Sequence, residues 1–188
     1  MEGRGQLCQE KLQALYTAIY DDSMWLIDLV ENLLSITRIG SDQAELSKQP
    51  EPAEEVLAEA VQKARKHLPG IKFTVTVPED LLMVPMDPIL IEQVLSNLIE
   101  NAAVHGVTTT AIRLSVRKTE DGFAAFSVRD NGNGIPKALL PHLFDYSIRH
   151  TSAPVGDGKR NMGLGLSVCS AVAVSYTHLR AHETRHDL

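Results

Sequence analysis

Cysteine is scarce in this 188-residue chain, and long apolar runs are absent from it. The two cysteines, Cys8 and Cys169, lie far apart and match no spacing of a metal or redox motif, which predicts free thiols in a reducing compartment. No apolar run approaches the roughly 18 residues of a membrane span, and the start Met-Glu-Gly-Arg-Gly lacks the apolar core of a signal peptide. We therefore expect a cytoplasmic chain.

Basic residues are also in the minority, since 18 Lys and Arg stand against 24 Asp and Glu, for a net charge of −6. This balance, without a long Lys/Arg cluster, argues against a nucleic-acid partner. Hydrophobic residues make up 44% and charged residues 22%, which is the profile of a globular protein rather than a disordered one. The length accommodates one domain of about 120 to 150 residues plus an appendage.

Apolar residues recur every seven positions near the start of the chain, at Leu12, Ile19, Leu26 and Leu33. This spacing predicts a long amphipathic helix within residues 7–40. The pattern is typical both of a helix that forms a dimer seam and of a helix that packs on its own domain, and periodicity alone favours neither. Residues 41–52, which end in Gln-Pro-Glu-Pro, are predicted to be a linker because proline cannot continue a helix.

Residues 53–174 are predicted to form one domain that mixes helices and strands. Asp87 is placed to cap the second of its helices, and a Thr-Glu-Asp-Gly turn joins its last two strands as a hairpin. The expected elements are helices at 53–67, about 89–105 and 166–174, strands at 72–77, 111–118 and 123–129, and a short helix near 141–146 within a long loop at 130–162.

Residues 175–188 differ in character from the rest and contain three of the seven histidines. A helix would place His178, His182 and His186 on one face, where they could bind a metal, but nothing nearby supplies a fourth ligand. The segment resembles a translated linker joined to a shortened reading frame, so we expect it to be non-native and without function.

The first group of candidate functional residues lies on the helix expected at about 89–105. Asn97 and Asn101 are four residues apart and share a face with Glu100 and His105. Amide and carboxylate oxygens suit Mg²⁺, which keeps several waters and bridges phosphate oxygens. The alternative is that these residues form only the solvated face of an amphipathic helix.

The second group is Asp130-Asn-Gly-Asn-Gly-Ile135, where a predicted strand ends. Asp130 could accept a hydrogen bond from an exocyclic amine, and Gly132 and Gly134 would let the backbone approach a planar ring. An ordinary Asn-Gly turn is the plainer interpretation. A calcium loop is a third, but its spaced acidic residues and closing Glu are absent.

The third group is Gly163-Leu164-Gly165-Leu166, which opens the last helix, with Lys159 and Arg160 just before it. Free N–H groups at a helix start and two nearby cations favour phosphate. A single Gly-x-Gly is weak support, and neither the dinucleotide-binding nor the P-loop pattern is present.

In this order, the three groups and the Leu143-Phe144 pair resemble the asparagine, first glycine, phenylalanine and second glycine boxes of the GHKL ATP-binding superfamily. Residues 28–38 are similar to the second dimerisation helix of sensor histidine kinases. Residues 25–38 and 162–169 resemble Kdp-type kinases in particular, which respond to potassium or turgor.

The resemblance implies an α+β fold, a two-layer α/β sandwich of GHKL type preceded by a long dimerisation helix. It further implies that Asn101 ligates Mg²⁺, that Asn97 assists near the phosphates, and that Asp130 holds the adenine amine of ATP. Ile135, the two glycines beside it and Phe144 would line the site, 163–166 would hold the phosphates, and 136–162 would form a lid. Lys159 and Arg160 are candidate phosphate contacts, His105 a candidate ATP contact, and Glu100 a candidate catalytic residue.

The same resemblance implies partners and a reaction. The γ-phosphate of ATP would pass to a histidine and then to an aspartate on a response-regulator receiver domain. The chain would form a homodimer through its N-terminal helix, and its parent would be anchored in the membrane by segments outside this chain.

Two features depart from the family pattern. Val104 stands where many members carry Lys or Arg, and the His-Asp/Glu-Leu-Arg motif of the phosphate-accepting helix is missing, since His186-Asp-Leu188 lies at the wrong end. Two alternatives therefore stay open beside the kinase. The chain could be a nucleotide-binding or dimerisation module without kinase activity, or another GHKL ATPase of the chaperone or repair type.

Overall fold

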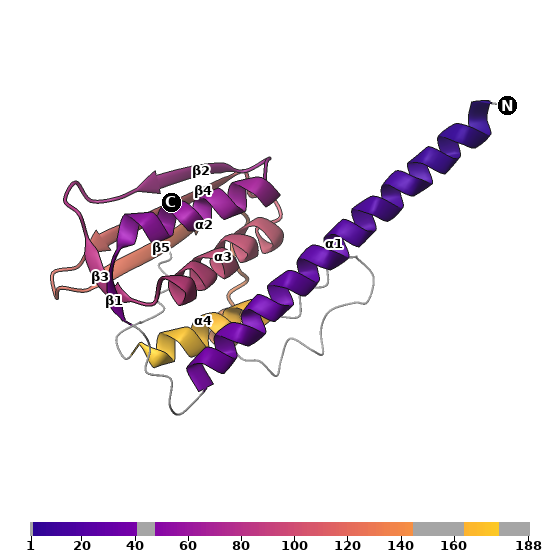
Figure 1. Cartoon of the computed structure of the whole chain (residues 1–188). Helices are drawn as coiled ribbons and strands as arrows, with labels where there is room; N and C mark the ends of the chain where they lie inside the picture. The colour runs from indigo at the N-terminus through magenta and orange to yellow at the C-terminus, as the bar shows by residue number, and fades with distance from the viewer. Residues whose placement is uncertain (1, 41–47, 145–163, 177–188) are drawn as a thin grey trace.

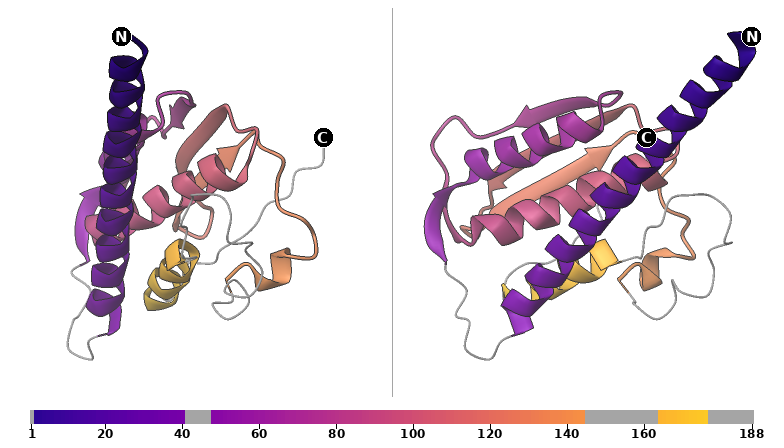
Figure 2. Two further views of the ribbon diagram at one scale, coloured as in Figure 1. Left: turned by 90° about the vertical axis from the view of Figure 1, so that its right-hand side faces the viewer. Right: turned by 45° about the vertical axis from the view of Figure 1, so that its right-hand side comes forward.

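The computed structural model describes residues 2–40, 48–144 and 164–176. A single long helix, α1 (Glu2–Gly40), crosses a body in which a layer of helices packs on a sheet (Figure 1). The N-terminal part of α1 projects beyond that body, and its other end lies against it (Figure 2). The expected α+β sandwich preceded by a long helix is confirmed.

The main sheet has three strands in the order β2 (Lys72–Thr76), β4 (Ala111–Lys118) and β5 (Ala124–Asp130). β2 pairs parallel to β4, and β4 pairs antiparallel to β5. The predicted hairpin joins β4 and β5, and Gly122 in its turn has a φ of 83°, a conformation that suits glycine.

A two-stranded ribbon lies beside this sheet, made of β1 (Gln49–Pro52) and β3 (Met83–Met86). The prediction of a linker throughout 41–52 is therefore wrong at its end, where residues 49–52 form a strand. Pro50 pairs opposite Pro85 in this ribbon. Both strands are edges, so a missing proline N–H can face away from the partner strand without loss of a ladder hydrogen bond.

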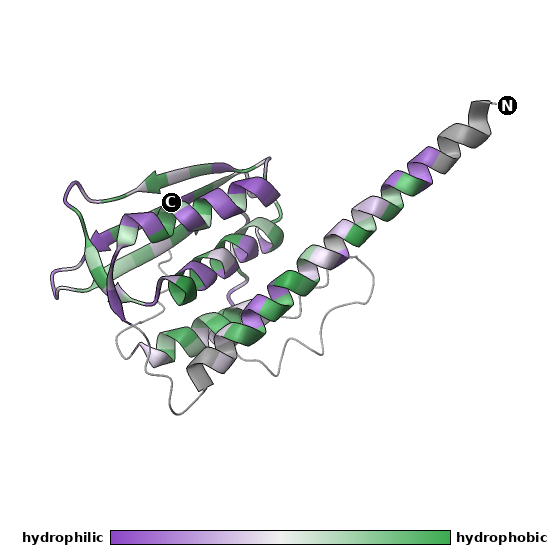
Figure 3. Cartoon of the chain, viewed as in Figure 1, coloured by the Kyte–Doolittle hydropathy of each residue, from purple (hydrophilic) through white to green (hydrophobic). Residues whose placement is uncertain are grey.

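Two amphipathic helices, α2 (Ala53–His67) and α3 (Pro88–His105), cover one face of the sheet. The carboxylate of Asp87 caps α3 as predicted, because its Oδ1 accepts from the backbone N–H groups of Ile89 at 3.0 Å and Leu90 at 3.3 Å. Hydrophobic and hydrophilic residues alternate in short stretches along α2 and α3 (Figure 3), and the buried residues of the two helices include Leu57, Leu95 and Ile99. The largest fully buried side chains of this core are Leu57, Met86, Leu95, Ile99, Ile112 and Leu114.

The last described helix, α4 (Leu164–Ser175), packs on α3 through Val168 and Val172, which bury Leu90. Tyr176 follows it, and its hydroxyl oxygen accepts from the Asp87 N–H at 2.7 Å. Ser175 and Tyr176 therefore belong to the packed domain, and the boundary predicted before residue 175 lies too early. The histidines of the tail lie outside the described residues.

The structure shows which side of α1 packs on the domain. Asn32 and Ser35 of α1 are buried against the domain, whereas Leu12, Leu15, Ile19, Leu26 and Leu33 are each about half exposed. The helix therefore packs on its own domain through a mixed stripe that includes Trp25, Asn32 and Ser35, and the described residues leave these five heptad-series side chains about half exposed.

Candidate functional site

Asn97 lies near the middle of α3 and is almost fully buried, with 4% of its surface exposed. Its amide nitrogen donates to Oδ1 of Asn32 in α1 at 3.0 Å, and Nε2 of Gln93 donates to the same oxygen at 3.3 Å. We call Asn32, Gln93 and Asn97 the amide cluster. The cluster joins α1 to α3 by buried hydrogen bonds. Asn97 therefore helps to hold the two helices together, a role that its sequence motif did not indicate.

The start of α4 passes close to the same residue. A Cβ atom added at Gly165 would lie 3.2 Å from the Asn97 Oδ1, which is tighter than most real Cβ contacts, so glycine is the residue that lets α4 approach α3 here. Cys169, one turn further on, is also buried, and burial raises the pKa of its thiol to about 12 even though a hydrogen bond with Asn97 acts in the opposite direction. The expected second glycine box and asparagine box are therefore neighbours in space.

Asn101 and Glu100 occupy the next turn of α3 and are both half-buried. Within the described residues the Asn101 amide has no hydrogen-bond partner, so its oxygen is available to a ligand. The pKa of Glu100 is raised, mainly by burial and further by the negative charge of Asp28 in α1. These two side chains combine an amide that has no partner among the described residues with a carboxyl group that holds its proton more tightly than usual.

The segment after β5 is fastened to the end of α3. The Asn133 N–H donates to the Gly106 carbonyl at 3.0 Å, and the Asn131 Oδ1 accepts from the N–H groups of Thr110 and Ala111, both at 2.9 Å. The Asp130 carboxylate is exposed, and one of its oxygens accepts from the Gly132 N–H at 2.7 Å. Asp130 is thus held by its own loop while it still faces solvent.

Two glycines of this loop have different physical reasons to be glycine. A Cβ at Gly132 would lie 2.6 Å from the Gly106 carbonyl oxygen, so a side chain there would push the loop away from α3. Gly134 has a φ of 71°, which lies in the left-handed region. Val107 has a φ of 55° beside them, and for a β-branched residue this is a strained conformation.

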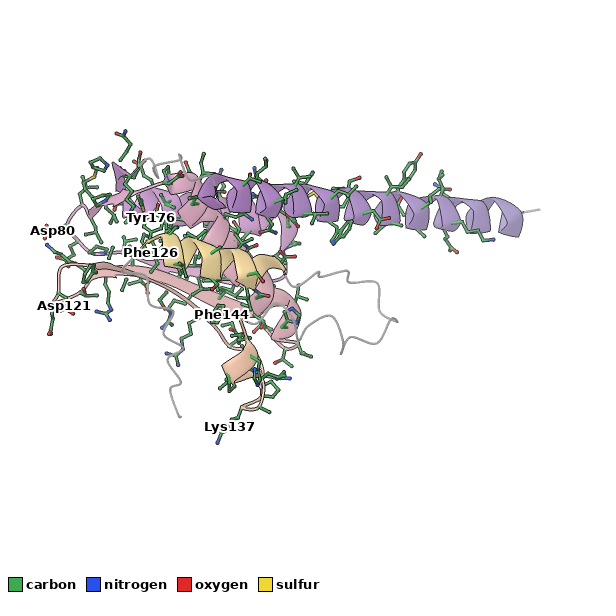
Figure 4. The ribbon with its side chains drawn as sticks, turned by 90° about the horizontal axis from the view of Figure 1, so that it is seen from below. Asp80, Asp121, Phe126, Lys137, Phe144 and Tyr176 are labelled. Atoms are coloured by element: carbon green, nitrogen blue, oxygen red, sulfur yellow. The ribbon has the colours of Figure 1, made fainter. Side chains whose placement is uncertain are left out.

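Two apolar side chains that follow this loop in the sequence are exposed. Ile135 is 42% exposed and Phe144 is 41% exposed. A 3₁₀ turn at Leu140–His142 overlaps the start of the short helix expected at 141–146 (Figure 4), and residues 145 and 146 lie outside the described residues. Residues 145–163, which hold Lys159, Arg160 and Gly163, lie outside the described residues, as does the side chain of Leu164. Leu166 is buried in α4, and His105 is exposed at the end of α3.

Residues of α1 that hold it against the helices of the domain, among them Asn32 beside Asn97, were not predicted from the sequence. Besides Asn32, Glu31 forms an ion pair with Lys63 of α2, with 2.8 Å between Oε2 and Nζ. Burial would lower the pKa of Lys63, but the hydrogen bond from Glu31 and nearby carboxylates leave it raised. The signal available in the sequence was a run of polar residues, Asp28, Glu31 and Asn32, on the side of the helix away from the heptad seam.

The described residues contain no group of three or more His, Cys, Asp or Glu side chains that could hold a metal by themselves. A Mg²⁺ ion held by one amide oxygen, phosphate oxygens and water still fits, because Mg²⁺ commonly takes only one or two protein ligands. None of the described helices combines the length and the apolar character that a membrane crossing needs.

Comparison with known proteins adds three findings. A family model for the histidine kinase-, DNA gyrase B-, and HSP90-like ATPases matches residues 86–185, more than half of the chain. The sensor protein KdpD of Clostridium acetobutylicum is 40% identical over 92% of this chain and 19% of its own length. The signal transduction histidine-protein kinase AfsQ2 of Streptomyces coelicolor is 31% identical over 97% of this chain and 32% of its own length.

Among solved structures, full-length ShkA in complex with AMPPNP superposes on 87% of this chain and 34% of its own, with a TM-score of 0.60 and 24% identity. This likeness shows a shared fold. The chain spans about a fifth to a third of the length of the two curated relatives.

Proposed function

The chain belongs to the family of histidine kinase-, DNA gyrase B-, and HSP90-like ATPases, and on that premise we propose that it is the ATP-binding catalytic domain of a two-component sensor histidine kinase. Its homology to the catalytic domains of sensor histidine kinases supports this choice among the branches of the family. The observation that carries the proposal is the fastening of the Asp130 loop to the end of α3, the helix that bears Asn101, whose amide has no hydrogen-bond partner in the described part of the chain.

The family match supports ATP binding, and we propose how the residues share this task. Asp130 accepts the hydrogen bond of the adenine amine, and Gly132, Gly134 and Ile135 lie along the base. Phe144 closes the edge of the site. The start of α4, from Gly163 to Leu166, presents backbone N–H groups to the phosphates, with Lys159 and Arg160 as the nearest cations in sequence.

Mg²⁺ is proposed as the partner of the Asn101 amide oxygen. When bound, the ion neutralises phosphate charge and orients the γ-phosphate. Asn97 is proposed to act indirectly, because its amide nitrogen is engaged by Asn32 and its oxygen lies beside the position of Gly165. It would hold the start of α4 in place for the phosphates. His105 would line the same end of α3.

The reaction proposed for the whole protein transfers the γ-phosphate from ATP to a histidine nitrogen and then to an aspartate of a response-regulator receiver domain. Glu100 is the candidate to receive the proton that the histidine gives up, because its raised pKa makes it a better base than an ordinary carboxylate.

We also propose a homodimer and a cytoplasmic position for this part of the protein, with membrane contact only through other segments of its parent. The support for a dimer is the heptad seam of α1, whose leucines and Ile19 stay about half exposed although the helix is docked on its own domain.

Calorimetric titration with ATP and Mg²⁺ tests the proposal. Asn101→Ala should abolish the Mg²⁺-dependent part of binding, and Asp130→Ala should abolish most of it, because the amine would lose its acceptor. Thr74→Ala, an exposed residue of β2, is the matched control and should bind like the parent chain. A folded parent chain that binds no ATP, or variants that bind as the parent does, would overturn the assignment.

A further inference from the structure

Among the residues that the structure describes, no helix covers one face of the three-stranded sheet. In Figure 4 the helices lie together on one side of the sheet, and the strands present their other side to the opposite half of the picture. Phe73, Ile112, Leu114 and Val116 are buried beneath the helices. Because side chains alternate along a strand, the residues between them point to the uncovered face.

That face is basic. Its four charged residues are Lys72, Arg113, Arg117 and Arg129, all of them exposed. We call this set the basic sheet face. The outward positions of β2, β4 and β5 include no Asp or Glu. The net charge of the chain is −6, so the residues outside this face carry an even larger negative charge. The basic sheet face is therefore a positive patch on an acidic molecule.

Two of the arginines stand directly opposite each other, since Arg113 pairs with Arg129 across β4 and β5. Like charges in that position destabilise a sheet. In the part of the chain that the structure describes, neither guanidinium has an ion pair. An anion placed between them would turn this repulsion into two charge-assisted contacts, and a carboxylate matches the planar fork of a guanidinium.

Hydroxyl groups surround the arginines. Thr74 pairs with Arg113 on the side of β2, and Ser115 pairs with Ser127 in the next outward row. Successive outward rows are about 7 Å apart, which is also the distance between alternate side chains of an extended peptide. The face thus offers anion and hydrogen-bond contacts at the repeat of an extended chain.

We propose that the basic sheet face binds a short acidic segment of a partner protein. Its outward positions carry no aromatic residue, so they lack the stacking platform that single-stranded nucleic acid uses. Glu79 and Asp80 after β2, and Glu120 and Asp121 in the hairpin turn, lie beyond the strand ends. These acids repel a polyanion or an anionic bilayer that extends past the patch, whereas a short segment stays within it.

The probe is a fluorescein-labelled ten-residue peptide of alternating Glu and Ser, and its anisotropy is followed on titration with the chain. Arg113→Gln with Arg129→Gln should weaken binding by at least about tenfold, because two charge-assisted contacts are lost. Arg65→Gln with Lys66→Gln removes the same charge from the last turn of α2 and should change binding by less than about twofold. Arg113→Lys with Arg129→Lys should give an intermediate loss, because charge remains but the fork is gone.

Three results would overturn the proposal. One is no binding of the peptide by the parent chain at low salt. Another is an equal loss in the α2 control, which would mean that net charge alone is responsible. The third is tighter binding of a ten-nucleotide deoxythymidine strand, or of vesicles containing phosphatidylglycerol, than of the peptide. Circular dichroism checks that each variant is folded.

Discussion

Replacing Asn32 by alanine removes the single oxygen that accepts hydrogen bonds from both Gln93 and Asn97. Two amide donors, on residues that are 9% and 4% exposed, would then lie buried without a partner. Each such donor costs about 1–3 kcal/mol, so the combined loss is about 2–4 kcal/mol, because Gln93 at the edge can turn partly to water. If the docking of α1 stabilises the chain by less than this amount, α1 will detach from the domain, because water can then bond to both donors.

The only tryptophan of the chain, Trp25, is half-buried on α1 and reports this docking directly. In urea, the Trp25 emission of Asn32→Ala should shift at a lower concentration than the loss of secondary structure in the rest of the domain. Ser23→Ala is the matched control, because the Ser23 hydroxyl bonds only to the Ile19 carbonyl of its own helix, and we expect a change within about 0.5 kcal/mol.

A triple variant separates unsatisfied donors from lost contact. Asn32→Leu, Gln93→Leu and Asn97→Leu together remove all three polar partners, and stability should return to within about 1 kcal/mol of the parent, since an apolar set leaves no unpaired donor. If the Trp25 emission of Asn32→Ala shifts at the same urea concentration as that of the parent chain, the amide cluster does not hold α1 on the domain. A triple leucine variant that is no more stable than Asn32→Ala would show that unpaired donors are not the cause of the loss.

Two other substitutions test electrostatics and backbone strain. The pKa of Glu100 is raised in the folded chain above the ordinary value of 4.5, so the folded state holds its proton more tightly and stability falls as pH rises through the range above 4.5. Glu100→Gln should therefore raise the melting temperature at pH 7 and flatten this part of the pH profile, and an unchanged profile would contradict the assignment. Val107 has a φ of 55° and is 79% exposed, so Val107→Asn should stabilise the chain by about 1 kcal/mol in urea denaturation, because asparagine tolerates the left-handed conformation. A loss of stability in that variant would show that the valine side chain has a packing role.

Local sequence signals predicted the elements whose pattern is complete within one stretch. The helix at 53–67 matches α2 at both ends because its apolar spacing is regular and it is bounded by Pro52 and a Pro-Gly turn. Asp87 could be assigned as a cap because capping involves only the next three residues. The ribbon of β1 and β3 had no such signal, since Gln-Pro-Glu-Pro does not alternate and its partner strand begins more than 30 residues later.

The candidate site divides in the same way. The order and chemistry of Asn101, Asp130 and the glycines that follow were readable from the sequence, and they carried the resemblance to GHKL ATPases. The placement of Asn97 was not, because its hydrogen-bond partner lies 65 residues away on a different helix. A motif specifies which side chains are present, but a distant segment such as α1 determines which of them form hydrogen bonds within the protein.

Periodicity and local groups of side chains were enough to predict most helices and the three strands of the main sheet, to reveal the family, and to nominate residues for ATP binding, because all of these signals lie within short stretches of sequence. The folded arrangement was needed to show that α1 docks through the side that bears Asn32 and Ser35, that a side chain at Gly132 would meet the Gly106 carbonyl, and that four cations share the sheet face which no described helix covers. Each of these results comes from residues distant in the chain and brought together by packing, and no local pattern encodes their distances.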